Sequence, residues 1–545
     1  MVKSSKKKPL RADEVLASVH AALAIHDTGE AIQLANAALE QGVETPLLLN
    51  LSAYNLELQG RLIEAMGLLE RAFRLAPADP VILNAIGRNY SKQGQAAPAL
   101  RAFEMALSVL PSYAAAHNGR GLALEMMGQL DGAWAAQETA ARLAPAFPDP
   151  LGAMASMALQ REDWAAARAY AERALALEPF QSAASVSLAV LDQREGDHAA
   201  VATRMGELIR HGVLAPLHEA TAQRLLADAL DAMGRPSEAF PVYTAANQLL
   251  RHAYKSTYGR EGVEGATALT ARLIGYFERA AADAWRPAPG GSGESAGATG
   301  HVFLVGFPRS GATLLEQALV RHPGIVTLDE QATFGDVGVH FFTNDALDNL
   351  AALDAASAER LRTDYWERVR AYGVDPKGKV FVDKLPLRTL WLPYIAKLFP
   401  DAKVLFVRRD PRDVVLNAFC RRFQVTPALY PFTELNDLAR FYTGIMDLAE
   451  VYREKLDLPW RVHRHEDLIE DFDTEVKAIC DFLEVEWASA TQEAKQSDGQ
   501  IPDASRAAQS LYRGGTGQWR AYADGLAPVM PILQPLVDRY GYSAA

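Results

Sequence analysis

The amino-acid sequence predicts an all-α solenoid of paired helices followed by an α/β domain with a parallel sheet. Three observations carry this prediction: a 34-residue period in the N-terminal half, a Pro- and Gly-rich interruption at residues 286–299, and apolar strands that alternate with helical stretches after it. The length agrees with more than one fold, because 545 residues exceed what a single hydrophobic core usually organises.

The N-terminal half repeats with a period of 34 residues, which is typical of helix-turn-helix units that stack into a solenoid. Each glycine of the repeat falls where the first helix of a unit should end, and each alanine falls where two helices pack closely. We therefore predict a solenoid over residues 13–285, after a basic disordered tail at residues 1–12. The series that keep the period are Pro77, Pro111, Pro145 and Pro179; Gly60, Gly94, Gly128 and, after an interruption at Glu162, Gly196; and Ala65, Ala99, Ala133 and Ala167.

These positions resemble the Gly, Ala and Pro of the tetratricopeptide consensus, although its early Trp is missing and the units after about Gly196 are degenerate. A solenoid of this kind has a concave groove of a size that suits another protein. A structural spacer or a dimer surface is the alternative interpretation. Of these, a protein partner on the groove is favoured.

Composition excludes several classes of function. Apolar residues make up 49% and charged residues 22%, and the net charge of -12 argues against nucleic acid, which is bound by surplus Lys and Arg. The two cysteines, Cys420 and Cys480, form no pattern suited to a disulfide framework or to zinc. We therefore expect no metal and a reducing compartment, the cytoplasm. The absence of a long apolar stretch leads us to expect no signal peptide and no membrane partner.

Residues 286–299 (RPAPGGSGESAGAT) hold too few large apolar groups to pack, and they are expected to form a flexible linker. The next domain is predicted over residues 300–545. Apolar strands that begin at His301, Val380, Lys403 and Trp460 alternate with helical stretches, which predicts a parallel sheet that binds phosphates at the strand C-termini.

The first of these strands runs into a glycine turn and a helix, the order of a phosphate-binding loop. The segment Gly306 to Thr313 supplies both glycines and the final Thr of the nucleotide P-loop, but it has Ala312 where that loop has Lys. A nucleotide kinase is disfavoured, because the outer phosphates lose a main charge stabiliser. Arg309 offers a replacement cation, and backbone N–H groups of the turn still form an anion cradle.

The segment GFPRSGAT resembles the 5'-phosphosulfate loop of sulfotransferases that use 3'-phosphoadenosine-5'-phosphosulfate (PAPS). Four further segments are similar to motifs of that family and come in the same order, so that the resemblance covers essentially all of residues 300–545. They are VDKLP at 382–386, which carries the family's catalytic Lys; the 3'-phosphate motif KVLFVRRDPRDVVLNAF at 403–419; HRHEDL at 463–468; and the closing loop YRGGTGQWR at 512–520.

The resemblance implies that PAPS is the sulfate donor. Four positions depart from the family pattern: Ala312 lacks a Thr hydroxyl, Asn417 replaces a Ser at the 3'-phosphate, and His465 and Leu314 stand where aromatic rings lie beside the adenine. The residues expected to bind the donor are Arg309, Ser310, Gly311, Ala312, Thr313, Leu314, Arg409, Asn417, His465, Arg513 and Gly514.

Tyrosylprotein sulfotransferases and their bacterial relatives are the most similar branch, because His322 and Pro323 are followed by the acidic pair Asp329 and Glu330. The resemblance implies that Glu330 is the general base, which takes the proton of a phenol or alcohol as it attacks sulfur. Lys384 and Arg309 complete the expected catalytic set by stabilising charge on the transferring group.

The acceptor stays open between tyrosine in a protein, a glycan hydroxyl and a small phenol, and the branch favours a polypeptide. The competing hypothesis is a catalytically silent scaffold, in which the repeats bind a partner and the changes at Ala312 and Asn417 have inactivated the second domain. Retention of Arg309, Glu330 and Lys384 speaks against this hypothesis.

Overall fold

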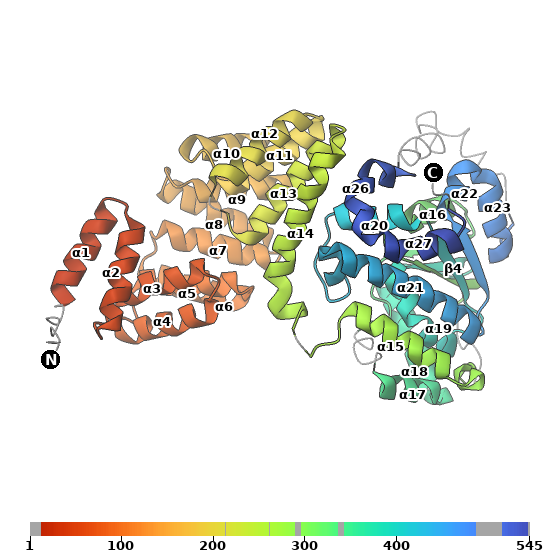
Figure 1. The fold of residues 1–545 in the computed structure, drawn as a ribbon. Helices are drawn as coiled ribbons and strands as arrows, with labels where there is room; N and C mark the ends of the chain where they lie inside the picture. The colour runs from red at the N-terminus through yellow and green to blue at the C-terminus, as the bar shows by residue number, and fades with distance from the viewer. Residues whose placement is uncertain are drawn as a thin grey trace, which may run out of the picture. The chain divides into compact units, whose positions relative to one another are not determined.

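The protein is described by a computed structural model that covers residues 12–212, 214–260, 262–288, 296–335, 343–486 and 515–542 (Figure 1). The chain forms two compact units, Met1–Leu214 and Ala215–Ala545.

The first unit is a succession of helices in which each helix packs against the next along the chain. This arrangement confirms the predicted array of helix pairs. The helices are α1 (Ala12–Ala24), α2 (Thr28–Glu40), α3 (Pro46–Leu58), α4 (Leu62–Leu75), α5 (Pro80–Lys92), α6 (Ala96–Val109), α7 (Ala114–Met126), α8 (Leu130–Leu143), α9 (Pro148–Gln160), α10 (Trp164–Leu177), α11 (Ser182–Glu195) and α12 (His198–His211).

Turn chemistry explains the repeat. Gly60, Gly94 and Gly128 adopt φ values of 74°, 75° and 74°, the left-handed conformation that ends the first helix of each pair. Glu162, which interrupts the glycine series, takes the same conformation with φ of 57°. The period is therefore structural even where the glycine is missing. The alanines of the third series are fully buried, which lets the paired helices approach closely.

The second unit begins with helices that lie before the expected linker: α13 (Pro216–Ala232), α14 (Pro236–Tyr258), α15 (Ala266–Arg279) and the short η1 (Ala282–Trp285). The compact unit thus starts at Ala215, whereas the sequence placed the domain boundary at residues 286–299. The physical reason is burial, since Leu273, Phe277 and Trp285 belong to the same hydrophobic cluster as Phe303 of the α/β domain.

Among the described residues of this unit, five parallel strands form a sheet in the order β2-β3-β1-β4-β5. They are β1 (Gly300–Gly306), β2 (Ile325–Asp329), β3 (Val380–Lys384), β4 (Lys403–Arg408) and β5 (Trp460–Arg464). The four predicted strands and their parallel pairing are confirmed, and β2 is the strand that the sequence analysis did not anticipate.

Helices cover both faces of the sheet. Alternate side chains of β1 point to opposite faces and pack in two different hydrophobic clusters. Val302 and Leu304 pack with α16 (Ala312–Leu319), α22 (His465–Glu470) and α23 (Phe472–Leu483). Phe303 and Val305 pack in the larger cluster on the other face. The elements of that side and of the sheet edges are α17 (Asn344–Ala351), α18 (Ala355–Ala371), η3 (Pro386–Trp391), α19 (Leu392–Leu398), α20 (Pro411–Cys420), η4 (Tyr430–Thr433), α21 (Leu435–Lys455), η5 (Gln518–Tyr522), α26 (Ala523–Leu526), η6 (Ala527–Val529) and α27 (Met530–Arg539).

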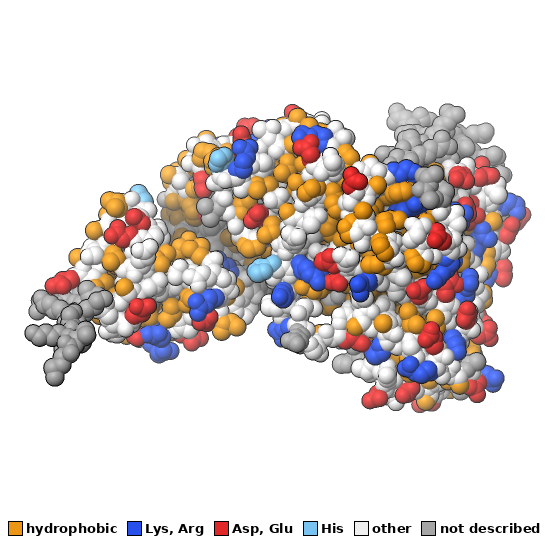
Figure 2. All heavy atoms as spheres, in the orientation of Figure 1, with side chains coloured by type: hydrophobic (Ala, Val, Ile, Leu, Met, Phe, Trp, Pro, Cys, Tyr) orange, Lys and Arg blue, Asp and Glu red, His pale blue; other side chains and the backbone are white. Residues whose placement is uncertain are grey.

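Acidic and basic side chains are interspersed over the visible face of the second unit (Figure 2). Within the described ranges, none of the helices combines the length and the apolar character needed to cross a membrane.

Candidate active site

The candidate site lies at the carboxyl edge of the sheet, where β1 turns into α16. Gly306 ends the strand with φ of 155°, and a side chain there would bring a Cβ within 2.7 Å of the Val407 carbonyl oxygen. Arg309 and Gly311 follow with φ values of 73° and 103°. The first N–H groups of α16 have no acceptor inside the helix, so the turn presents backbone donors and the positive end of the helix dipole to an anion.

His465 presses against this loop. A Cβ added to Gly311 would lie 2.2 Å from Nδ1 of His465, so only glycine fits beneath the imidazole. Burial, together with the charge of Arg409, lowers the pKa of His465 to about 3, which keeps the ring neutral. His465 is the first residue of α22, and the structure brings it to the phosphate loop. Its contact with adenine stays a prediction.

Arg409 joins three segments that are distant in the sequence. Its guanidinium donates to the carbonyl oxygen of Arg309 at 3.2 Å and to that of Gly515, and it lies 3.9 Å from the carboxylate of Asp413. The side chain is buried, and its Nε has no hydrogen-bond partner among the described residues. Arg409 therefore retains a buried donor for an anion beside the phosphate loop.

The carboxylate of Asp413 holds the segment that follows Gly515. Asp413 accepts hydrogen bonds from the backbone N–H groups of Gly517 at 2.6 Å and Trp519 at 2.9 Å. Burial raises the pKa of Asp413 although Arg409 and these donors act in the opposite direction. Asn417, one turn later in α20, donates to the Asp413 carbonyl oxygen at 2.8 Å.

Trp519 packs against the first turn of α20. The guanidinium of Arg412 lies 3.8 Å from the centre of the Trp519 ring and is hydrogen bonded to Asp410. Arg513 and Gly514, which the sequence assigns to the same closing loop, lie outside the described residues. Their roles stay predictions.

A buried ammonium group lies at the end of β3, next to the phosphate-loop strand. Lys384 is 2% exposed and donates to Asp329 at 2.5 Å and to Glu330 at 3.1 Å, whose carboxylates are 54% and 55% exposed. Burial lowers the pKa of Lys384, but the two carboxylates raise it by more, so the group stays charged. Glu330 has φ of 50°, and its N–H bonds to the Lys384 carbonyl oxygen at 2.8 Å. The structure therefore brings two predicted catalytic residues together and adds Asp329.

A polar network that the sequence analysis missed supports this pair. Asp383 points to the face opposite Lys384, accepts hydrogen bonds from Thr333 and Tyr365, each at 2.8 Å, and forms an ion pair with Arg388 at 3.2 Å. Arg388 also donates to the carbonyl oxygen of Gln331 at 2.8 Å, one residue after Glu330. The network thus fixes the turn that carries the exposed carboxylate. Strand alternation in VDKLP was the available signal, since neighbours in a strand face opposite sides.

The remaining predicted donor contacts differ in exposure. Ser310 and Ala312 are buried in the turn, whereas Arg309 and Thr313 are exposed. Leu314 is 6% exposed and lies in the hydrophobic cluster between the sheet and α22 and α23. Its side chain is therefore a packing group in this structure, and its predicted place beside the adenine stays untested.

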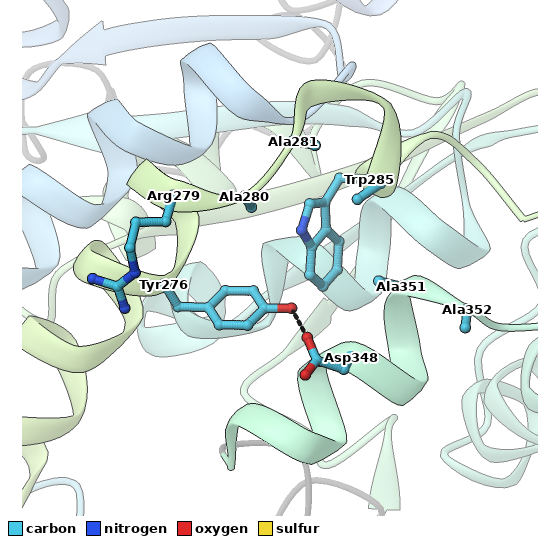
Figure 3. A pocket seen from close by; sticks show the side chains of 9 residues that line it. Tyr276, Arg279, Ala280, Ala281, Trp285, Asp348, Ala351 and Ala352 are labelled. Atoms are coloured by element: carbon cyan, nitrogen blue, oxygen red, sulfur yellow. Dashed lines mark hydrogen bonds between the residues drawn. The ribbon is translucent and has the colours of Figure 1, made fainter.

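A shallow hollow of about 540 Å³ lies elsewhere, between α15, η1 and α17 (Figure 3). Tyr276 reaches across it and donates to Asp348 at 2.7 Å. The hollow is lined mainly by alanines together with Arg279 and Trp285, and it contains none of the predicted site residues. The chemistry of the carboxyl edge therefore lies outside it.

Residues 301–489 match the model of the sulfotransferase family. An uncharacterised protein of Aquifex aeolicus (strain VF5) is 25% identical over 250 residues, which cover 43% of this chain and 32% of that protein. Nodulation protein NoeE of Sinorhizobium fredii is 26% identical over 207 residues, 32% of this chain and 48% of the relative. A Caenorhabditis briggsae protein named "Putative protein-tyrosine sulfotransferase" is 22% identical over 196 residues, 34% of this chain and 66% of the relative. The chain thus spans a third to two thirds of the length of these relatives.

Solved structures similar to this chain include a tetratricopeptide repeat protein and PilF. The repeat protein, from Parabacteroides merdae, has a TM-score of 0.33 and 16% identity, with coverage of 44% of this chain and 93% of its own. PilF of Pseudomonas aeruginosa has a TM-score of 0.31 and 16% identity, with coverage of 39% and 95%. The first unit is built from helix pairs, and the second unit carries a sulfotransferase-family domain.

The contact between Gly311 and His465 predicts the effect of a single methyl group. Gly311→Ala should weaken binding of adenosine 3',5'-bisphosphate by roughly 5- to 150-fold, since forcing a methyl group into a packed site costs on the order of 1–3 kcal/mol. Gly373→Ala is the matched control, because Gly373 also has a positive φ, of 80°, but meets no atom within 4 Å. Calorimetry should show normal affinity for the control. Equal affinities of both variants would contradict the proposed loop geometry.

The half-buried imidazole of His301 predicts a pH dependence of stability. Burial lowers its pKa to about 3, and its Nε2 lies 2.9 Å from the Tyr365 hydroxyl. Below about pH 6.5 the unfolded chain takes up a proton that the folded chain refuses, so the free energy of unfolding falls as the pH drops towards the folded pKa. Between pH 7 and pH 5, the free energy of unfolding measured by chemical denaturation should therefore fall less steeply for His301→Gln than for the wild type. The two slopes should differ by about 1 kcal/mol per pH unit below the unfolded pKa. Parallel curves for the two proteins would refute this assignment.

Proposed function

We propose that the sulfotransferase-family domain of this chain moves a sulfuryl group from PAPS to a hydroxyl or phenol acceptor. The observation that carries the proposal is the placement of Lys384, with its two exposed carboxylates, beside the strand that leads into the phosphate loop. A cation for the transferring group and a base for the acceptor thus adjoin an anion cradle at one edge of the sheet.

The residues present fit PAPS as the donor substrate. The loop from Gly306 to Thr313 offers backbone N–H groups at the start of α16, which suits a 5'-phosphosulfate. Arg409 supplies a buried donor that suits a 3'-phosphate. Asn417, whose amide donates to the Asp413 carbonyl oxygen, lies on the helix that follows Arg409. The loop lacks the Lys that a nucleoside triphosphate needs, which supports PAPS over ATP.

In the proposed transfer, the acceptor oxygen attacks sulfur as the bond between sulfur and the bridging phosphate oxygen breaks. Glu330 takes the acceptor's proton, and Lys384 and Arg309 stabilise the charge that develops on the leaving oxygen and the sulfuryl group. The leaving product is adenosine 3',5'-bisphosphate. Asp329 has a supporting part, since its hydrogen bond keeps Lys384 in place while Glu330 turns to the acceptor.

A polypeptide is the acceptor we favour. The supporting observations are the acidic pair after His322 and Pro323 and the similarity to the relative named as a protein-tyrosine sulfotransferase. The helical array of the first unit would recruit that acceptor or another protein partner. We place the protein in the cytoplasm, in agreement with Cys420 and Cys480 being free thiols. The competing function is a silent scaffold, and the complete Lys384, Asp329 and Glu330 cluster argues against it.

Ligand binding by the full chain tests the donor. Calorimetry should show that adenosine 3',5'-bisphosphate binds at least about tenfold more tightly than ATP, because each hydrogen bond to a charged group contributes on the order of 1.5–3 kcal/mol. Incubation with sulfur-labelled PAPS and a lysate should transfer label to protein. Equal or tighter binding of ATP would sink the sulfotransferase proposal, and label in glycans or small molecules would replace the polypeptide acceptor. Binding without any transfer would favour the silent scaffold.

The acidic pair predicts different effects of two amide substitutions. Glu330→Gln should reduce turnover by roughly 10²-fold to 10⁴-fold, because an amide cannot accept the proton, while adenosine bisphosphate affinity stays unchanged. Asp329→Asn is the matched variant, since it keeps an oxygen that accepts from Lys384 and should lose clearly less activity. A larger loss for Asp329→Asn would transfer the role of base to Asp329. Loss of binding in Glu330→Gln would make that residue structural.

A further inference from the structure

The hairpin of α13 and α14 caps the helix that carries the candidate 3'-phosphate residues. Arg224 of α13 is 5% exposed and donates to the carbonyl oxygens of Phe419 and Cys420, at 3.3 Å and 2.6 Å. Asn247 of α14 is fully buried and donates to the Phe419 carbonyl oxygen at 2.9 Å, while its own oxygen accepts from Arg224 at 2.6 Å. These carbonyls end α20, where a cation complements the helix dipole.

The same hairpin also contacts the closing segment, residues 515–526. Asp231 lies two turns after Arg224 on α13 and accepts a hydrogen bond from the Tyr522 hydroxyl. Phe240 of α14 contacts the rings of Phe419 and Tyr522, with centroids 5.6 Å and 6.0 Å apart. A Cβ added to Gly525 would lie 2.6 Å from the Phe240 ring, so the closing segment runs tightly against the hairpin.

The hairpin thus contacts both α20, which carries Asp413, and the closing segment to which Asp413 binds. Asp413 lies on α20, and it binds Gly517 and Trp519 just before Tyr522. The hairpin therefore anchors α20 at its C-terminus and the closing segment at Tyr522. A buried guanidinium and a buried amide must have their hydrogen bonds satisfied. Here both Arg224 and Asn247 donate to carbonyl oxygens at the end of α20.

We propose that the α13–α14 hairpin is a positioning element of the donor site, in which Arg224 and Asp231 hold α20 and the segment 515–526 in the arrangement that binds the 3'-phosphate end of the donor. This inference rests on the proposed function for its ligand. It assigns helices that precede the matched family region to the binding of the donor.

Three substitutions in the full chain test the proposal. Arg224→Met removes the cation at the C-terminus of α20, whereas Arg224→Lys retains a cation that can donate to carbonyls. Tyr522→Phe removes only the hydroxyl that donates a hydrogen bond to Asp231. Lys397→Met is the matched control, because Lys397 is another buried cation that donates to three backbone carbonyls, those of Ala284, Arg286 and Ala351. Thermal unfolding of all variants measures the general loss of stability.

The first measurement is hydrogen exchange of the segment 515–526 without any ligand. Exchange should be faster in Arg224→Met and Tyr522→Phe than in wild type, restored in Arg224→Lys, and unchanged in Lys397→Met. Unchanged exchange in the first two variants overturns the proposal, and so does equal acceleration in the control. This measurement is independent of the donor, so a wild type that fails to bind adenosine bisphosphate would sink the proposed function separately.

The second measurement is binding and kinetics. Arg224→Met should weaken adenosine bisphosphate binding and raise the KM for PAPS by roughly 3- to 30-fold, with kcat and the KM of the acceptor nearly unchanged, as expected for coupling through contacts outside the ligand. Arg224→Lys should recover most of the affinity. A fall in kcat at constant KM for PAPS, or equal effects in Lys397→Met, would overturn the positioning role.

Discussion

The candidate site depends on the parallel pairing of β1 with β3 on one side and β4 on the other. The register places Leu304 opposite Lys384, and Gly306 opposite Val407. Because parallel strands end at one edge, this pairing alone brings the phosphate loop, the buried ammonium and the arginines after β4 into one region. A shift of one residue would turn Lys384 to the other face of the sheet and exchange it with Asp383.

Lys384 and Asp383 are neighbours in the strand and have different roles. Lys384 faces the exposed carboxylates, whereas Asp383 faces a dry layer of aromatic rings, where burial raises its pKa and Arg388 lowers it by less. The first residue presents charge to the site, and the second fixes the turn at Gln331 and Glu330 through Arg388. The position of an exposed acid is thus set by a fully buried one.

Local sequence patterns predicted the helix pairs and most strands of the sheet. The 34-residue spacing of Gly, Ala and Pro reports turns and close packing within each helix pair, and the apolar runs from His301 and Lys403 report strands buried on both faces. The strand IVTLD was missed because it is short and three of its five residues are polar or partly exposed. The boundary at Ala215 and the partners of Arg224 could not be predicted, because they depend on contacts between segments nearly 200 residues apart.

The hydrogen bond between Tyr522 and Asp231 has a consequence for how the chain folds. Its two residues are 291 positions apart, so the hairpin leaves the ribosome long before the segment that it will hold. Closing so large a loop carries an entropic cost that local helix pairs do not bear. The first unit can therefore form during synthesis from neighbouring contacts, whereas the second unit is completed only when its last residues emerge.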